Sequence, residues 1–278
     1  RKRISGRGFY SFLDDAYKNF DEKKESLVTG MKKAAAEIFA KCNLIVSYTA
    51  DDKGYELMSG LIKELIDKLS AEQLPVVTRA LTLKKTRLAL KTSGQVNFVC
   101  RVGDYDKAGI EYNGAMRILA SMMNSDYLWN NIRVKGGAYG CGAAFGSYSS
   151  SLGAFSSYRD PNLEKTNEIY DKAPEYVESF NADEREMTKY VIGTISDLDL
   201  PKTPSVKGSD SFEAYISGLT EQMLQKERDE VLGATVEDIR ALSGMVKAVL
   251  DDGYFCVVGN EDKINEVKDM FDVIEPLA

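Results

Sequence analysis

The segment from residue 137 to residue 160 places the strongest constraint on the fold. Its small and apolar residues alternate on both sides of the turn sequence GSYSSSLG, and alternation with a period of two is typical of a half-buried strand. We therefore predict an antiparallel hairpin in which residues 138–145 pair with residues 153–159. A second hairpin is predicted from KKTRLALKT (84–92) and QVNFVCRVG (95–103), because only Ser93-Gly94 separates these two strand-like runs.

Apolar residues recur at helical spacing through most of the remaining chain. Asp160-Pro161 is a suitable helix start, because aspartate is a good N-cap and proline fits the first helical turn. Short β-branched runs predict further strands at 43–49 and 253–259. The pattern favours an α+β fold, with a mainly antiparallel sheet of about five or six strands and helices packed on one face. Helices are predicted at residues 14–39 (one or two), 51–69, 112–129, 162–180, 183–197, 209–231, 235–250 and 261–274.

Two predicted strand–helix units, 43–69 and 253–274, share the plan of a strand, an acidic turn and an amphipathic helix. This similarity predicts two related domains, the first reduced to a helix–strand–helix remnant; chance similarity is the alternative. Residues 70–82 contain a proline and no clean period, which is typical of a linker. We therefore assign residues 1–75 to the end of a preceding related domain with its linker, and residues 76–278 to the final α+β domain. The lack of an initiator methionine fits a piece of a longer polypeptide.

Charge and hydropathy argue against two classes of partner. The formal net charge is -7 and no basic stripe is present, so a nucleic-acid partner is not expected. No apolar run approaches the ~18 residues that span a bilayer, so no membrane partner is expected either. The first ten residues, RKRISGRGFY, have no apolar signal core, and a cytoplasmic location is therefore expected.

The chain contains no histidine. This absence excludes Ser-His-Asp and Cys-His catalytic arrangements and the usual nitrogen ligands of zinc. The four cysteines form no C-x-x-C pair and lie in or beside apolar runs, so we predict free core thiols rather than metal ligands or disulfides. No metal site is predicted in this chain. The cysteines are Cys42, Cys100, Cys141 and Cys256.

The stretch NNIRVKGGAYGCG (130–142) holds the most informative polar residues. Arg133 lies at the end of a predicted helical stretch and Tyr139 at the start of a predicted strand, and Gly136-Gly137 between them permits a sharp turn. A guanidinium and a phenol on one side of such a turn offer donors for a carbonyl oxygen or the oxyanion it becomes. They supply neither a nucleophile nor a metal. The alternative is a structural arginine and a half-buried tyrosine.

The glycines that follow suggest a nucleotide site only superficially. GCGAAFG (140–146) is one residue away from the dinucleotide-binding fingerprint. That fingerprint needs a helix to begin at its last glycine, so that the helix N-terminus meets phosphate. Here the strand-like alternation continues instead, and no nucleotide is expected.

These motifs carry a family resemblance. LWNNIRVKGGAYGCGAAF, followed by SYRDPNLEKTNEIYD, resembles the last domain of presequence-protease-like zinc peptidases in the pitrilysin/insulinase family. QVNFVCRVGDYDKAGIEYNGAMRILASMM and YVIGTISDLDLPKTPSVKG fit the same pattern. The likeness covers most of residues 70–278, and residues 1–69 resemble the tail of the preceding domain.

The resemblance implies an enzyme of four related α+β domains in two halves that close around a chamber. In that family the first half carries the zinc motif H-x-x-E-H and a distal glutamate ligand. The second half contributes an arginine and a tyrosine that reach the substrate peptide near the zinc. By position these are Arg133 and Tyr139, with Gly136 and Gly137 beside the substrate.

The resulting hypothesis is the C-terminal part of a zinc-dependent metalloendopeptidase that degrades short unstructured peptides. Its partners are expected to be the N-terminal half of the same polypeptide and the peptide substrate. Zinc is expected in the full-length enzyme and none in this piece, which is predicted to be inactive alone. The rival hypothesis is a non-catalytic homologous partner domain that binds peptide or a subunit; a free-standing binding module is a third.

Overall fold

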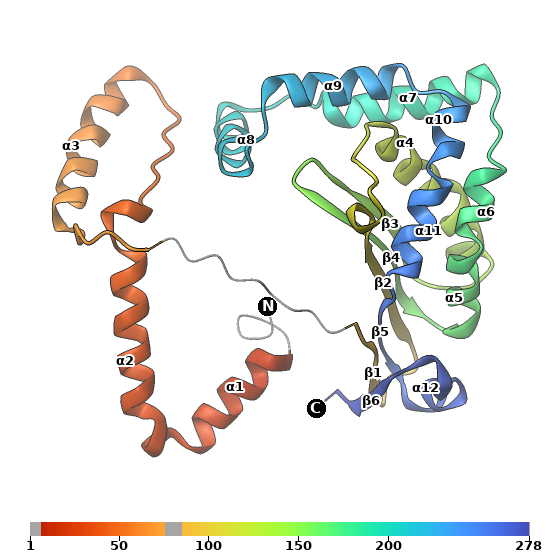
Figure 1. Ribbon diagram of the computed structural model, residues 1–278, viewed down its shortest axis with the longest axis horizontal. Helices are drawn as coiled ribbons and strands as arrows, with labels where there is room; N and C mark the ends of the chain where they lie inside the picture. The colour runs from red at the N-terminus through yellow and green to blue at the C-terminus, as the bar shows by residue number, and fades with distance from the viewer. Residues whose placement is uncertain (1–6, 76–84, 278) are drawn as a thin grey trace. The chain divides into compact units, whose positions relative to one another are not determined.

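The computed structural model describes residues 7–75 and 85–277 (Figure 1). The chain divides into two compact units, one formed by residues 1–82 with 202–212 and the other by residues 83–201 with 213–278. The boundary predicted between residues 75 and 76 adjoins residues 76–84, which lie outside the described residues, as does most of the predicted linker at 70–82.

The first unit is helical in its described part. It contains α1 (Arg7–Lys18), α2 (Phe20–Ile38), a short 3₁₀ helix (Lys41–Asn43) and α3 (Asp52–Lys68), which Asp51 caps by accepting from Gly54 N at 2.8 Å. Residues 44–49 form no strand, so the predicted strand at 43–49 and its repeat of 253–274 are wrong. Within the described residues of this unit no neighbouring strand is present, and an extended run without a partner cannot form a ladder.

The second unit is built on a six-stranded sheet in the order β3-β4-β2-β5-β1-β6. Pairings β3–β4, β4–β2 and β2–β5 are antiparallel, and pairings β5–β1 and β1–β6 are parallel. The predicted α+β fold with a mainly antiparallel sheet is therefore confirmed, and so is the hairpin of 138–145 with 153–159. The strands are β1 (Arg87–Thr92), β2 (Asn97–Asp104), β3 (Gly140–Ser147), β4 (Ser150–Asp160), β5 (Tyr254–Asn260) and β6 (Val273–Pro276).

The other predicted hairpin is wrong, because β5 lies between β1 and β2. Two asparagines fix the connection of β1 and β2 to the end of β5. Asn260 donates from its backbone N to Asn97 Oδ1 at 3.1 Å and from Nδ2 to Gly94 O at 2.9 Å. The turn at Ser93-Gly94 thus passes the end of β5 and connects two strands that are not neighbours in the sheet.

Four predicted helices are interrupted or cut short. Residues 235–250 form two helices that meet at Leu242. Residues 162–180 form two helices, with Pro174 in the first turn of the second, and residues 209–231 break at Gly218, which has a φ of 70°. The predicted helix at 261–274 ends early, and the last residues form β6 instead. The helices are α4 (Ala115–Met122), α5 (Glu164–Asp171), α6 (Ala173–Glu178), α7 (Glu184–Leu198), α8 (Pro204–Ser217), α9 (Glu221–Leu232), α10 (Val236–Ala241), α11 (Ser243–Asp251) and α12 (Glu261–Glu266), with 3₁₀ turns at Tyr105–Ala108 and Lys268–Met270.

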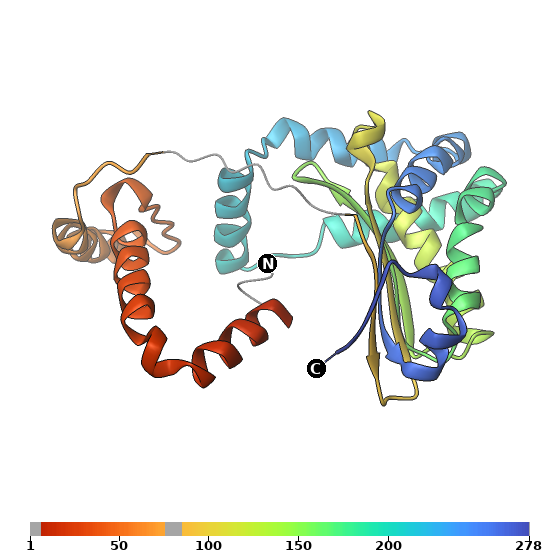
Figure 2. The same ribbon diagram turned by 60° about the horizontal axis from the view of Figure 1, so that its bottom comes forward.

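Helices of this unit cover one face of the sheet, as predicted (Figures 1 and 2). α11 approaches the sheet so closely that a Cβ atom on Gly103 would lie 2.0 Å from the carbonyl oxygen of Val249, and one on Gly153 would lie 2.4 Å from its side chain. The core side chains Phe155 and Val257 are fully buried on this face. Phe98 and Tyr158 are 39% and 50% exposed, because strand alternation directs them to the opposite face.

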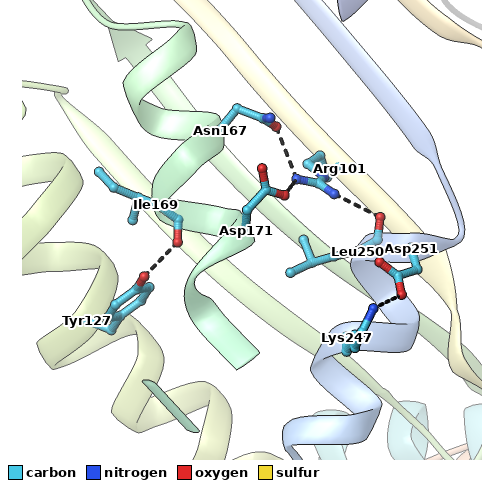
Figure 3. Close-up of polar contacts among 8 residues, drawn as sticks. All are labelled: Arg101, Tyr127, Asn167, Ile169, Asp171, Lys247, Leu250 and Asp251. Atoms are coloured by element: carbon cyan, nitrogen blue, oxygen red, sulfur yellow. Dashed lines mark hydrogen bonds and ion pairs between the residues drawn. The ribbon is translucent and has the colours of Figure 1, made fainter. Parts of the chain in front are cut away.

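Polar side chains lock the helical layer to the sheet (Figure 3). From β2, the Arg101 guanidinium donates to Leu250 O at 2.9 Å in α11, and it also binds Asn167 and Asp171 of α5. Tyr127 Oη donates to Ile169 O at 2.6 Å and so attaches the segment after α4 to α5. These contacts give hydrogen-bond partners to polar groups inside the packed layer. Buried polar groups need such partners.

Candidate functional site

The helix that begins with α4 widens before it ends. Residues Met123–Tyr127 and Trp129–Val134 form π-helical turns, and Lys135 N donates to Asn130 O at 3.0 Å across five residues. Wide turns of this kind occur frequently at functional sites. Here they bring Trp129 and Arg133 to the last turns of the helix.

The helix stops at Gly136-Gly137. Gly137 has a φ of 79°, and its N–H donates to Arg133 O at 3.1 Å, while Ala138 N donates to Ile132 O at 3.1 Å. A Cβ atom on Gly136 would lie 2.5 Å from Ile132 O. Both positions therefore favour glycine for different reasons, and the expected sharp turn is present.

This turn brings Arg133 and Tyr139 together. The Arg133 Cζ atom lies 5.8 Å from the centroid of the Tyr139 ring and 5.8 Å from that of the Trp129 ring, within the range of cation–π attraction. Among the described residues the guanidinium has no carboxylate partner. Tyr139 is 67% exposed, so the predicted alternative of a half-buried tyrosine does not describe it.

A β-bulge supports Tyr139 from β4. Asn97 pairs with Asp160 and Val99 with Ser157, so two residues, Tyr158 and Arg159, stand opposite the single residue between Asn97 and Val99. Arg159 has a φ of 49°, in the left-handed region that residues other than glycine rarely adopt. Bulges change the direction of side chains and are over-represented beside active sites.

The bulge holds both the backbone and the ring of Tyr139. Tyr139 N donates to Tyr158 O at 3.1 Å and to Arg159 O at 3.4 Å. The ring centroids of Tyr139 and Tyr158 lie 5.9 Å apart, and Tyr158 contacts Phe98 edge-to-face at 5.2 Å. We call Trp129, Tyr139, Tyr158 and Phe98 the aromatic row. Trp129, Tyr158 and Phe98 were not predicted from the sequence, because the bulge and the π-helical turns bring them near Arg133 and Tyr139.

The residues after the bulge brace the glycine turn. Asp160 is fully buried, and its carboxylate accepts from Asn162 N at 2.8 Å and from Thr166 Oγ1 at 2.7 Å. Asn162 Nδ2 in turn donates to Gly136 O at 2.5 Å. The predicted helix start at Asp160-Pro161 is wrong by a few residues, because this turn precedes α5, which begins at Glu164. The segment YRDPN thus fixes the position of the turn between Arg133 and Tyr139.

The arrangement offers hydrogen-bond donors and no metal ligands. In the part of the chain that the structure describes, no group of three or more His, Cys, Asp or Glu residues could hold a metal ion, so these residues form no zinc site. Burial raises the pKa of the Cys141 thiol and the Asp160 carboxylate adds to this, against the opposing charge of Arg133, so Cys141 is a poor nucleophile.

The cysteines are free in the described structure, but only three lie in or near the core. Cys100, Cys141 and Cys256 are half-buried, whereas Cys42 is exposed. The prediction of a core thiol is wrong for Cys42, because the described residues around it in the first unit bury only Ala40. Over the described residues, none of the helices has the length and apolar character required to span a bilayer.

Two solved structures share the fold of this chain. The peptidase M16 inactive domain from Pseudomonas fluorescens matches with a TM-score of 0.53 and 13% identity, over 74% of this chain and 51% of that one. A conserved protein from Enterococcus faecalis V583 matches with a TM-score of 0.53 and 12% identity, over 76% of this chain and 50% of that one. At this identity the similarity establishes the fold alone.

The family follows from the sequence match. The family model of the PreP C-terminal domain matches residues 87–260, and the chain belongs to this family. The resemblance to the C-terminal part of presequence-protease-like members of the pitrilysin/insulinase family is therefore confirmed.

Two curated relatives align with almost the whole chain. Protein HypA of Clostridium perfringens is 41% identical over 275 residues, which are 99% of this chain and 28% of the relative. Presequence protease 1 of Arabidopsis thaliana is 30% identical over 285 residues, covering 99% of this chain and 26% of the relative. The chain thus spans about a quarter of the length of these relatives.

Proposed function

We propose that this chain is the part of a zinc-dependent metalloendopeptidase that binds short unstructured peptides opposite the zinc-holding half. The observation that carries the proposal is the pair of a half-buried Arg133 and an exposed Tyr139, whose polar groups have no carboxylate partner in the described structure. Membership of the PreP C-terminal domain family and the presequence protease relative support the substrate class. The partners are then the N-terminal half of the same polypeptide and the peptide.

The chemistry of the pair is donation to a developing negative charge. A guanidinium is permanently charged and presents several N–H donors in a planar fork, and the phenol adds one O–H donor. Donors that are already in place stabilise an oxyanion without reorganisation when the carbonyl becomes tetrahedral. The surrounding rings and the bulge give this preorganisation. The rest of the machinery is assigned to the upstream part of the polypeptide, where zinc, when bound, supplies Lewis-acid polarisation.

The domain assignment follows the same proposal. Residues 1–75 are proposed to be the end of the preceding related domain. Their helices support this, because large apolar side chains on them are exposed: Phe12 is 48%, Phe20 57% and Leu61 51% exposed. Apolar faces of this kind are usually covered in the complete protein.

The rival function is a non-catalytic partner domain that binds peptide or a subunit. It is favoured by one observation, that the Pseudomonas fluorescens structure with the same fold is described as an inactive domain of peptidase M16. The two functions differ in what the upstream part of the polypeptide contains, because only the peptidase requires the motif H-x-x-E-H there.

The test compares the intact polypeptide with residues 1–278 alone. We expect the intact protein to hold one zinc ion and to cleave a fluorogenic peptide, and residues 1–278 to do neither. Metal analysis and the peptide assay measure both. One tightly held zinc ion per 278-residue chain with turnover would contradict the proposal. Peptide binding by the intact protein without turnover would establish the rival.

A further inference from the structure

The ring of Tyr158 lies beside the phenol ring that the proposed function requires. The Tyr158 ring contacts two other rings. Its centroid lies 5.9 Å from the Tyr139 ring centroid and 5.2 Å from the Phe98 ring centroid. Edge-to-face and tilted contacts at these distances are attractive and depend on orientation. The contact with Phe98 therefore holds the Tyr158 ring beside the Tyr139 ring.

The backbone geometry shows that this placement is imposed by the fold. The extra residue in β4 puts Arg159 at a φ of 49°, and the two bulge carbonyls both accept from Tyr139 N. Strained backbone of this kind persists only where the surroundings determine it, and it gathers at functional sites. Here the residue that follows the bulge is secured, since Asn97 Nδ2 donates to Asp160 O at 3.0 Å.

Neither core packing nor hydrogen bonding explains the Tyr158 side chain. It is half-exposed, so it contributes little to the core, and its hydroxyl group makes no hydrogen bond to the residues that the structure describes. The position of the ring, rather than the hydroxyl group, is therefore its relevant property. We infer that Tyr158 is a positioning residue for Tyr139, an inference that rests on the proposed function.

The same geometry predicts which change matters. Removing the ring frees Tyr139 on one side, whereas removing only the hydroxyl group leaves both ring contacts in place. A reacting group that is misplaced by about 1 Å can lose as much as about 100-fold in rate. Tyr158→Ala in the intact polypeptide is therefore expected to lower kcat by roughly 10-fold or more with a smaller change in KM. Tyr158→Phe is expected to retain kcat within about twofold, because its ring is unchanged.

Leu152→Ala is the matched control. Leu152 lies on the same strand and the same face as Tyr158, and its exposed fraction is nearly equal, 52% against 50%. It lies at the other end of β4, away from the bulge. We expect unchanged kcat in this variant. An equal loss of kcat in Leu152→Ala and Tyr158→Ala would mean that truncating this face matters in general, and the inference would fail.

A double-mutant cycle separates positioning from an independent contact. If Tyr158 acts through Tyr139, Tyr158→Ala should cost little further activity in a Tyr139→Phe background, because the hydroxyl group it positions is already absent. Independent contributions would instead multiply, and that result would overturn the inference while leaving the proposed function intact.

A structural measurement keeps the inference testable if the proposed function fails. Should Tyr139→Phe retain full turnover, a crystal structure of the intact Tyr158→Ala polypeptide decides the matter. A Tyr139 ring in its original place would overturn the positioning role, and a displaced ring would support it.

Discussion

The side-chain amide of Asn124 binds both backbone groups of Ala143. Nδ2 donates to Ala143 O at 3.0 Å, and Oδ1 accepts from Ala143 N at 2.6 Å. Ala143 belongs to β3, an edge strand whose outer N–H and C=O groups have no strand partner, and Asn124 belongs to the first π-helical segment. The amide therefore replaces a missing strand and fixes the helix that carries Arg133 against the strand that follows Tyr139.

Asn124→Ala should destabilise the domain by roughly 1–3 kcal/mol, because two backbone groups of the buried residue Ala143 lose their partners. Urea unfolding of the wild-type and variant chains measures this difference. Asn130→Ala is the control: its side chain is exposed, and a change within about 0.5 kcal/mol is expected. Equal stability of Asn124→Ala and wild type would show that the edge of β3 does not need this amide.

Asp252 should make the second unit sensitive to acid. Its carboxylate is 8% exposed and receives Lys85 Nζ and Lys107 Nζ, each at 2.7 Å. Burial alone raises the pKa of this carboxyl group, but the two lysines and Asp104 N–H outweigh burial and lower the pKa below its usual value. A lowered pKa stabilises the folded state above the unfolded pKa of about 3.9. The free energy of unfolding should therefore fall as the pH drops below about 4.

Asp252→Asn should lower stability at pH 7 by roughly 1.5–3 kcal/mol and should flatten the acid side of the stability profile. The neighbouring Asp251→Asn is the control. Asp251 pairs with Lys247 on the surface of α11, with both side chains at least 60% exposed (Figure 3), and such pairs contribute about 0.3–0.5 kcal/mol. Denaturant unfolding between pH 2 and pH 7 compares them, and parallel profiles for wild type and Asp252→Asn would contradict the assignment.

The local spacing of apolar residues predicted the strands of the sheet better than it predicted which strands lie side by side. Alternation in residues 138–159 identified the β3–β4 hairpin, because both strands and their turn are contiguous. The β1–β2 pairing failed because β5, about 150 residues further along the chain, pairs with both strands. The short run Val273–Pro276 became a strand only because β1 offers it a parallel partner. Contacts between distant segments determine the strand order and the formation of β6, and the local spacing of residues carries no information about such contacts.

In the candidate site, too, contacts within one short segment were predictable and contacts between distant segments were not. Arg133, Tyr139 and the turn at Gly136-Gly137 lie within seven residues, so their convergence was predictable. Tyr158 joins them through a bulge in another strand, and its register depends on pairing with β2. The π-helical turns were equally invisible, because their apolar spacing is close to that of an α-helix.

The two glycines of the turn should respond differently to an added methyl group. Gly137→Ala meets only strain at a φ of 79°, since the nearest atom would be 3.7 Å away, and should cost about 1–2 kcal/mol. Gly136→Ala should cost more, because its Cβ atom would lie 2.5 Å from Ile132 O and the backbone must shift. Gly193→Ala, in the exposed middle of α7 with no atom within 4 Å, should instead stabilise by about 0.5–1 kcal/mol. Thermal unfolding ranks the three, and the reverse order of the first two would contradict the turn geometry.

Tyr139→Phe and Arg133→Lys test the donor pair in the intact polypeptide. Tyr139→Phe removes one hydroxyl group and leaves the ring contacts with Arg133 and Tyr158 in place. The loss of one oxyanion donor typically lowers kcat by about 10²–10³-fold. Arg133→Lys should also lower kcat, because an ammonium group lacks the planar fork of the guanidinium, whose Cζ atom lies 5.8 Å from both the Trp129 and Tyr139 ring centroids.

Neither change should affect folding, and this expectation distinguishes a substrate-binding pair from a structural one. Tyr139 is 67% exposed, and exposed substitutions usually change stability by less than about 0.5 kcal/mol. The measurements are kcat, KM and melting temperature for each variant beside wild type. Full turnover in Tyr139→Phe would remove the catalytic role. A drop in melting temperature that parallels the loss of activity would show that the arginine and tyrosine stabilise the fold and do not bind the peptide.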